Sequence, residues 1–243
     1  MSETPFFKIT EDDLSLLKTP TFVTFGETMV RDTPADNERP ERTRLVHLSM
    51  AGREITLAMG LSRLGVPSYY ITRVPDNPYG RGLRNIAREH GIETGHFVWA
   101  PKTEPIGRFI YEIGRTPRKN TGVYQRMYSA ASKLDAGMVD WQAALRDARL
   151  FHTSGITFGL STHSGYARNY PYDAFLEAMD HKPAGCLVGL DYNYRSTLWT
   201  PAQAYDVMTP ILEDQGLHTD HCCHHQHARP RTKHNRSQRA SQQ

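Results

Sequence analysis

The sequence predicts an α/β fold built on a mostly parallel sheet with helices on its faces. Short segments rich in β-branched and aromatic residues alternate along the chain with segments of helical periodicity, as in repeated strand–helix–strand units. The apolar run Cys186–Leu190 has no polar alternation, which is typical of a parallel strand buried on both faces.

The first half of the chain alternates clearly. Residues 21–25 (TFVTF) predict a strand that ends at Gly26, and the charged, proline-containing residues 31–44 predict an exposed loop. Leu57, Leu61 and Leu64 recur with helical spacing, so a helix is expected up to Gly65. The other elements expected here are strands over 45–52, 66–74 and 95–99 and a helix over 77–91 that Gly91 ends.

The second half continues the pattern. Extended segments are expected over 107–114 and 122–128, followed by a helix over 140–148. Residues 149–157 predict a strand that ends in a polar glycine turn, and a helix is expected from about 166 to 180. The apolar strand at 186–193 and a helix over 200–213, with Pro201 near its start, complete the pattern.

Composition limits the function classes. The chain has 243 residues, of which 38% are hydrophobic and 23% charged, as expected for a soluble globular protein of one large or two small domains. No apolar run approaches the eighteen or so residues of a membrane span, and the acidic N-terminus is unlike a secretory signal. We therefore expect a cytoplasmic protein without a membrane partner.

Charge argues against a nucleic-acid partner. The formal net charge is +3, and residues 214–243 carry all of this excess because they hold five Lys or Arg against two acidic residues. The remaining 213 residues are electrically neutral, so the body of the protein gives no basic surface of the kind that binds nucleic acid. The single cysteine of the body, Cys186, predicts a buried small hydrophobic residue in a reducing compartment.

Polar residues that follow predicted strands are the candidate site, because sites of parallel sheets lie beyond the carboxyl ends of the strands. Asp191, Asn193 and Arg195 follow the apolar strand at alternate positions, so we expect them to face the same way. Arginine offers a planar donor for carboxylate or phosphate, and asparagine a donor and an acceptor for hydroxyls. The competing interpretation is strand-end capping with a surface salt bridge. Gly52 and Ser154 are the other residues at such strand ends.

Two further stretches point to a polar small-molecule pocket. Tyr111, Glu112, Arg126 and Tyr128 lie on the two extended segments, where hydroxyls and a guanidinium group would line such a pocket, although solvent-facing strand residues explain them equally well. Gly52 opens the helix at 54–64, and backbone N–H groups at a helix start bind anions or hydroxyls.

Several of these stretches occur together in one family. VTFGE, AGREITLAMGLSRLG, RVPDNPYGRGLRNIAREHGIET, YQRMYSAASKL, FHTSGIT and DYNYRSTLW follow one another with the order and spacing of the ribokinase-like (PfkB) carbohydrate kinases. The resemblance covers residues 20–213 and is strongest to the 2-keto-3-deoxygluconate kinases. It implies an α/β core with a small β lid, formed near 26–50 and 107–128, and phosphorylation of a sugar-acid hydroxyl by ATP with Mg²⁺.

The resemblance also implies roles for individual residues. Gly52 would touch the sugar through its backbone, and Tyr111 and Arg126 would flank the sugar acid. Asn193 and Arg195 would lie between sugar and phosphates. The implied partners are a small-molecule sugar acid and a second subunit, paired through the lid as a homodimer.

The chain departs from the family pattern in two places. Ala51 and Thr56 stand where the family usually has a glycine and an asparagine, which weakens the expected sugar contacts. The Gly-x-Gly-Asp motif, whose aspartate is the family's general base, occurs nowhere in the 243 residues, so no catalytic residue is assigned. We therefore expect a domain over 1–213 that is incomplete at its C-terminus and inactive, or a pseudokinase that binds a sugar acid or pairs with another subunit.

The C-terminal stretch 214–243 fits no part of this domain. It contains one Leu and no Val, Ile, Phe, Tyr, Trp or Met, so we expect a disordered tail rich in His and Arg. Its adjacent Cys222 and Cys223 and clustered histidines lack the spacing of a structural metal site, and no metal is expected. The abrupt change in composition at Glu213 is what translation in a shifted frame would produce. A metal- or nucleic-acid-binding function through this tail is the third hypothesis.

Overall fold

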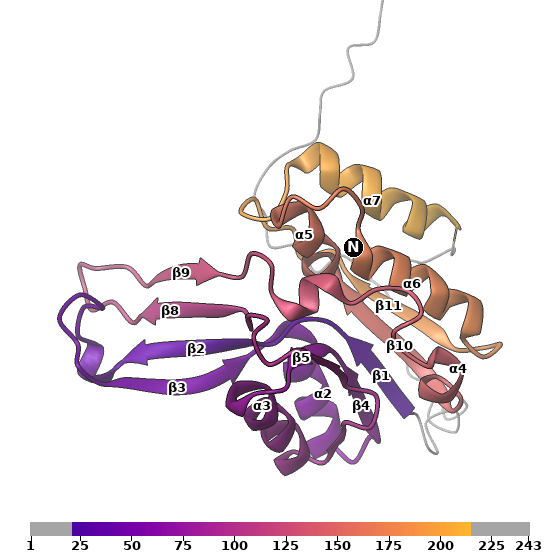
Figure 1. Ribbon diagram of the computed structural model, residues 1–243, viewed down its shortest axis with the longest axis horizontal. Coiled ribbons are helices and arrows are strands. Elements are labelled where there is room, and N and C mark those ends of the chain that lie inside the picture. Colours follow the sequence, from indigo (N-terminus) through magenta and orange to yellow (C-terminus); the bar gives the residue numbers. More distant parts are fainter. Residues whose placement is uncertain (1–20, 215–243) are drawn as a thin grey trace, which may run out of the picture.

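A parallel five-stranded sheet forms the core of the protein (Figure 1). The computed structural model describes residues 21–214, so residues 215–243, with their cysteines and histidines, lie outside the described range. All four strand pairings of the sheet are parallel, which confirms the predicted fold class. In spatial order the strands are β11 (Leu187–Asp191), β10 (Ala148–Ser154), β1 (Thr21–Phe25), β4 (Ser68–Ile71) and β6 (Ile92–Glu93).

Helices cover both faces of this sheet, because its central strands bury apolar side chains on each side. On β1, Val23 and Phe25 join one core cluster and Phe22 joins the other, as the alternation of a strand requires. The first cluster packs α4 (Trp141–Ala144), α5 (Gly155–His163), α6 (Tyr170–His181) and α7 (Pro201–Asp214). The second packs α2 (Arg53–Arg63) and α3 (Pro78–Glu89) on the opposite face (Figure 1).

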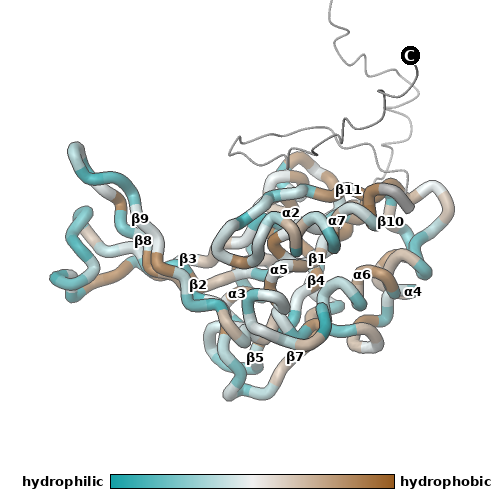
Figure 2. The backbone as a smooth tube through the Cα atoms, turned by 90° about the horizontal axis from the view of Figure 1, so that it is seen from above, coloured by the Kyte–Doolittle hydropathy of each residue, from teal (hydrophilic) through white to brown (hydrophobic). Residues whose placement is uncertain are grey.

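A separate four-stranded sheet projects from one end of this core (Figure 1). Its strands, in spatial order, are β3 (Val46–Ala51), β2 (Met29–Pro34), β8 (Arg108–Glu112) and β9 (Thr121–Gln125). The pairing of β2 with β8 is parallel, whereas the two outer pairings are antiparallel. Two short strands, β5 (Arg73–Pro75) and β7 (Val98–Ala100), form a third sheet. Figure 2 shows that hydrophilic segments dominate the outer end of the four-stranded sheet.

Several boundaries differ from the sequence predictions. The charged stretch predicted as a loop begins with the second half of β2, where the Asp32 carboxylate is buried because Arg108 on β8 pairs with it. The strand predicted over 66–74 divides into β4 and β5, which belong to different sheets. The helix predicted over 140–148 is only the four residues of α4, and β10 begins directly at Ala148.

Two predictions in the C-terminal half of the chain were wrong because of packing between distant parts of the sequence. The polar turn expected after β10 is the buried helix α5, whose Gly155 lies so close to Tyr192 that an added Cβ would be 2.3 Å from the Tyr192 carbonyl oxygen. The strand expected to be buried on both faces, β11, forms the edge of the sheet within the described residues, and Leu187 is 70% exposed. Cys186 is buried, as expected.

No helix within residues 21–214 is long and apolar enough to span a bilayer.

Candidate functional site

An ion pair joins the start of α2 to the end of β11. The Arg53 guanidinium donates from Nε to the Asp191 carboxylate over 2.7 Å, and Arg53 directly follows Gly52 in the chain. Because β1, β10 and β11 run in parallel, their carboxyl ends meet at the same edge of the sheet. The pair therefore places Gly52 and the residues after Asp191 at one edge, as the sequence predicts for a site.

Gly52 lies in a tightly packed part of this edge. A Cβ atom at Gly52 would lie 2.6 Å from the Glu27 carbonyl oxygen and 2.7 Å from the Thr28 hydroxyl, so no side chain fits without movement of the backbone. Gly52 is the N-cap of α2 in extended conformation, and its carbonyl oxygen accepts a hydrogen bond from the Thr56 hydroxyl over 2.6 Å. The Thr56 hydroxyl, which stands where the family usually has an asparagine amide, is thus hydrogen-bonded within its own helix.

The residues after β11 do not continue the strand alternation. Asn193 has φ +34°, in the left-handed region that asparagine tolerates better than most residues, so the backbone turns away after Asp191. The expectation that Asp191, Asn193 and Arg195 face the same way rested on strand periodicity, which stops at Asp191 because β11 ends there. The side chains of Asn193 and Asp191 nevertheless meet, since Asn193 donates from Nδ2 to the Asp191 carboxylate over 3.4 Å.

Arg195 is available for an anionic ligand. Its side chain is exposed, and its guanidinium donates one long hydrogen bond, 3.4 Å, to the Tyr194 carbonyl oxygen. An exposed guanidinium with so little engagement fits the phosphate groups of a nucleotide. Residues 21–214 contain no cluster of three His, Cys, Asp or Glu side chains that would hold a metal ion.

A buried carboxyl group, Glu54, links the elements that meet at this edge. Glu54 is 1% exposed, and its Oε1 accepts hydrogen bonds from the Ser154 hydroxyl at 2.5 Å and the Thr157 hydroxyl at 3.1 Å. Burial raises the pKa of Glu54, and the Ser154 hydrogen bond opposes this effect. The contact ties the first turn of α2 to the end of β10 and the start of α5. Ser154, a strand-end residue predicted for the site, thus binds Glu54.

Arg126 lies at the base of the four-stranded sheet, where it forms a buried ion pair with Glu27. Its Nε donates to Glu27 Oε2 over 2.8 Å and its Nη2 contacts the same oxygen, while the Ser129 hydroxyl donates to Oε1 over 2.5 Å. The side chains of Arg126 and Glu27 are 7% and 1% exposed. The described residues give Nη1 no hydrogen bond, so this nitrogen remains for a ligand.

Tyr111 lies on the four-stranded sheet, further from the core than Arg126. It pairs with Gly122 on β9, and the Arg31 guanidinium stacks over its ring with 4.4 Å to the centroid. Arg108 on β8 pairs with Gln125, the residue directly before Arg126. Tyr111 lies three residues further along β8 than Arg108, a separation of about 10 Å along the strand. The structure places the two side chains at different distances from the core instead of bringing them into contact.

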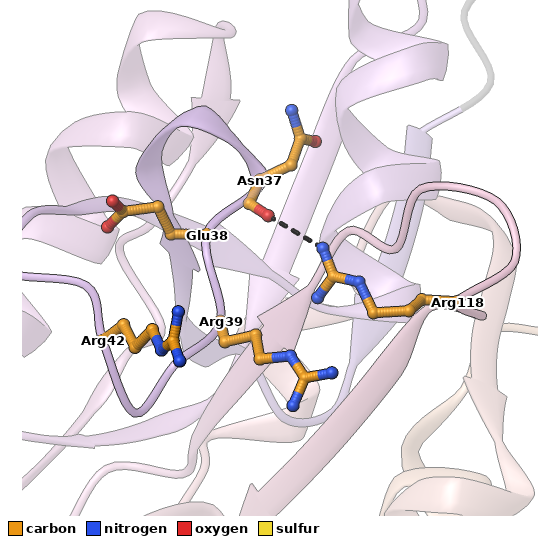
Figure 3. Close-up of a pocket in the computed structure, with 5 residues that line it drawn as sticks. All are labelled: Asn37, Glu38, Arg39, Arg42 and Arg118. Carbon is orange, nitrogen blue, oxygen red and sulfur yellow. Dashed lines mark hydrogen bonds between the residues drawn. The ribbon is translucent and has the colours of Figure 1, made fainter.

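A cavity of about 370 Å³ lies at the outer end of the four-stranded sheet (Figure 3). Its lining residues are Asn37, Glu38, Arg39, Arg42 and Arg118. The Arg118 guanidinium donates to the Asn37 carbonyl oxygen over 3.3 Å (Figure 3). Guanidinium groups would favour an anion here, but this cavity is at the opposite end of the sheet from Gly52 and belongs to no predicted site.

A family model described as the pfkB family carbohydrate kinase matches residues 20–213 of the sequence. The chain belongs to this family. The match spans all of the described elements, from β1 to α7, including the four-stranded sheet and the edge that holds Gly52 and Arg195.

Individual members of the pfkB family agree with this assignment. A 2-dehydro-3-deoxygalactonokinase of Haloferax volcanii is 36% identical over 192 residues, which are 78% of this chain and 57% of the relative. The crystal structure of a 2-dehydro-3-deoxygluconokinase from Thermotoga maritima aligns with a TM-score of 0.71 and 34% identity over 80% of this chain and 57% of that protein. A pfkB family carbohydrate kinase from Listeria grayi aligns with a TM-score of 0.69 and 27% identity, over 79% of this chain and 57% of that one. The chain thus spans little more than half the length of these relatives.

Sequence reasoning missed three charged residues of the site. Glu27 directly follows the first predicted strand and Gly26, so the rule used for Asp191 would have selected it. Arg53 and Glu54 directly follow Gly52, at a helix start, where only the backbone N–H groups were considered as donors to an anion or a hydroxyl. Their partners lie about 100 residues or more away in the sequence, and no local pattern indicates such pairs.

Proposed function

We propose that this pfkB-family chain binds a 2-keto-3-deoxy sugar acid between its core sheet and its four-stranded sheet. ATP, with Mg²⁺, is the phosphoryl donor that we propose for the complete catalytic unit, and a sugar-acid hydroxyl is the acceptor. We further propose that the 243 residues alone bind the sugar acid without phosphorylating it, because they contain no Gly-x-Gly-Asp motif to supply a general base.

The observation that carries the proposal is the Arg53–Asp191 ion pair, which holds Gly52 and the loop of Asn193 and Arg195 at one edge. A sugar acid at this edge presents hydroxyls and one carboxylate. Asn193 offers an amide to a hydroxyl, and Gly52 lets the start of α2 pack against Glu27 and Thr28 at this edge. Two relatives whose names specify a 2-dehydro-3-deoxy sugar acid support this substrate class.

The charged groups divide between the two ligands in this proposal. The Nη1 of Arg126 binds the carboxylate of the sugar acid, and Tyr111 closes the space from the four-stranded sheet. The exposed Arg195 binds the transferred phosphoryl group, whose charge a guanidinium neutralises well. Because the described residues hold no metal cluster, Mg²⁺ arrives with the nucleotide phosphates. Residues 1–213 are the domain that we propose for this function.

Isothermal titration calorimetry with 2-keto-3-deoxygluconate tests the binding proposal. We expect the wild-type chain to give heat with the sugar acid. Arg195→Ala should bind ATP more weakly than the wild type, and its affinity for the sugar acid should change less. Arg168→Ala is the matched control, because Arg168 is an exposed arginine whose guanidinium is already paired with Asp135 and Asp173. No heat at millimolar sugar acid would overturn the binding proposal. Phosphorylation at rates typical of kinases, roughly 1 s⁻¹ or faster, would overturn the proposed inactivity.

Subunit pairing is a second candidate function, and one row of the four-stranded sheet favours it. Leu48, Asp32, Ile110 and Val123 are direct neighbours across the four strands and therefore share one face. Leu48, Ile110 and Val123 are exposed, with Val123 at 66%, so this face presents an apolar row to solvent. A second copy of the chain would cover it.

Sedimentation velocity tests this pairing. We expect a dimer whose dissociation constant rises on Val123→Asp, because a carboxylate would be buried in the apolar row. Leu64→Asp is the control, since Leu64 is 81% exposed at the end of α2, outside the row. A monomer at all concentrations, or equal effects of the two substitutions, would refute the pairing.

A further inference from the structure

The chain passes four times between the core and the four-stranded sheet (Figure 1). It leaves the core after β1 and returns between β3 and α2. It leaves again between β7 and β8 and returns after β9. The residues at these crossings are Gly26–Thr28, Gly52, 101–107 and 126–129. The position of the four-stranded sheet depends on these crossings, because each of its strands is continuous with one of them.

One residue, Glu27, contacts all four crossings. It forms part of the first crossing, and its carboxylate binds the Arg126 guanidinium and the Ser129 hydroxyl of the fourth. A Cβ atom at Gly52, in the second crossing, would lie 2.6 Å from the Glu27 carbonyl oxygen. A Cβ atom at Gly107, in the third, would lie 2.7 Å from Glu27 Oε1. Glu27 thus lies against both glycines, through its backbone at Gly52 and through its carboxylate, beside the Met29 side chain, at Gly107.

The other ion pairs of the four-stranded sheet have a different geometry. Asp32–Arg108 joins β2 to β8, and Glu112–Arg118 joins β8 to the loop that follows it. Glu112–Arg118 lies within the sheet and its loop, whereas the Arg108 guanidinium also lies over the Tyr79 ring of α3, 5.8 Å from its centroid. Glu27–Arg126 differs because Ser129, on the core side of the fourth crossing, shares the carboxylate. Its burial also makes the pair difficult to break, since separation leaves a charge without a partner in a region of low polarity.

Backbone hydrogen bonds continue this junction on both sides. The Val30 N–H donates to the Gly107 carbonyl oxygen over 2.8 Å, which joins the start of β2 to the third crossing. The Ala130 N–H donates to the Pro105 carbonyl oxygen over 2.8 Å, which joins the residue that follows the fourth crossing to the third crossing. These amides report directly on whether the crossings stay together.

We propose that Glu27 is a positioning residue that fixes the four-stranded sheet against the core and holds the Arg126 guanidinium at their junction. The first part stands on the geometry of the crossings. The second part rests on the proposed function, since it gives Arg126 its orientation toward a sugar acid. Glu27 itself has both carboxylate oxygens engaged by the protein and does not need to touch the ligand.

Hydrogen–deuterium exchange of the full chain tests the first part. We expect Glu27→Gln to accelerate exchange at residues 28–30, 105–108 and 126–130 by roughly tenfold, the effect of one lost charged hydrogen bond. Exchange in the central strands β1 and β10 should stay unchanged. Glu112→Gln is the matched control, because it removes an ion pair inside the four-stranded sheet and should change only residues near 112–121. Unchanged exchange at the crossings, or a uniform acceleration throughout the protein, would overturn the proposal.

Two milder substitutions keep the test informative if Glu27→Gln does not fold. Ser129→Ala removes one of the hydrogen bonds to the carboxylate and should give the same pattern with a smaller amplitude. Glu27→Asp keeps the charge and should restore part of the protection, which a purely steric role would not explain. Absence of the pattern in Ser129→Ala would refute the proposal on its own.

Calorimetry then tests the second part. Glu27→Gln should weaken 2-keto-3-deoxygluconate binding by about tenfold or more. The same substitution should have a much smaller effect on binding of the analogue in which the carboxylate of this sugar is reduced to an alcohol. Equal losses for both ligands would overturn the assignment of Arg126. If neither ligand binds the wild-type chain, the proposed function fails, whereas the exchange pattern still decides the role of Glu27 at the crossings.

Discussion

Substitution of Gly52 by alanine would test whether close backbone approach shapes the candidate site. The added methyl group would lie 2.6 Å from the Glu27 carbonyl oxygen and 2.7 Å from the Thr28 hydroxyl. The first atom belongs to the backbone and cannot rotate away, so the start of α2 or the Glu27 crossing must move. Overpacking of this kind costs about 1–3 kcal/mol of unfolding free energy.

The assay is differential scanning fluorimetry on both Gly52→Ala and a control from the same helix. Each kcal/mol shifts the melting temperature of a chain of this size by roughly 2–4 °C, so Gly52→Ala should melt about 2–12 °C lower. Gly60→Ala is the control, because no atom lies within 4 Å of its added Cβ and Gly60 is inside α2. Removal of a helical glycine there should raise stability by about 0.5–1 kcal/mol.

The pair of variants separates two explanations. If the N-cap preference alone mattered, Gly52→Ala would cost up to about 1 kcal/mol, because glycine is a better N-cap than alanine. If the approach to Glu27 matters, the loss reaches about 1–3 kcal/mol, and Gly52→Ala also weakens sugar-acid binding. A Gly52→Ala variant that melts at the wild-type temperature or above it would refute the steric argument and, with it, the role of Gly52 in the site.

Three further substitutions test other features. Glu54→Gln should flatten the pH dependence of stability, because the pKa of Glu54 is raised in the folded state. The stabilisation that this shift gives the wild type is full below about pH 4, and it falls by about 1.4 kcal/mol for each pH unit as the pH rises toward the folded-state pKa. Equal changes in the unfolding free energy of wild type and variant between pH 5 and pH 8, measured by urea unfolding, would contradict this. Asn193→Ala should cost about 1–2 kcal/mol because of its positive φ, whereas Asn193→Gly should be nearly neutral in the same assay; equal losses would contradict the backbone explanation. Leu187→Lys should reduce light scattering on heating, because a charge at the exposed edge strand opposes strand pairing between molecules; unchanged scattering would show that aggregation starts elsewhere.

The fold class was predictable because local patterns determine it. Apolar segments such as Thr21–Phe25 and the leucine spacing of α2 indicate strand and helix directly. Gly65 and Gly91 end their helices with φ +86° and +73°, a conformation that glycine adopts without strain, so these two helix ends were also predictable. Motif order then indicated the pfkB family, which the family match confirms.

The errors have a common cause in tertiary packing. The stretch after β10 was interpreted as a turn from Ser154 and Gly155, yet Gly155 is small in order to pack against Tyr192, some 37 residues later in the sequence. The apolar β11 was interpreted as buried on both faces, because all-apolar parallel strands are usually covered on both sides. Its place at the edge depends on which strands pair, and no local pattern within β11 records that.

The sequence by itself determined the α/β class and the family, and it predicted Gly52, Asn193 and Arg195 as candidate site residues, since each depends on residue type and spacing along the chain. Only the tertiary structure decided how these segments meet. The partners of Arg53, Glu54 and Arg126 are 138, 100 and 99 residues distant, and an ion pair or hydrogen bond between such residues depends on strand order and burial. Burial is also the reason the contacts of Glu54 and Arg126 matter, because a polar or charged group removed from water must find its partner inside the fold.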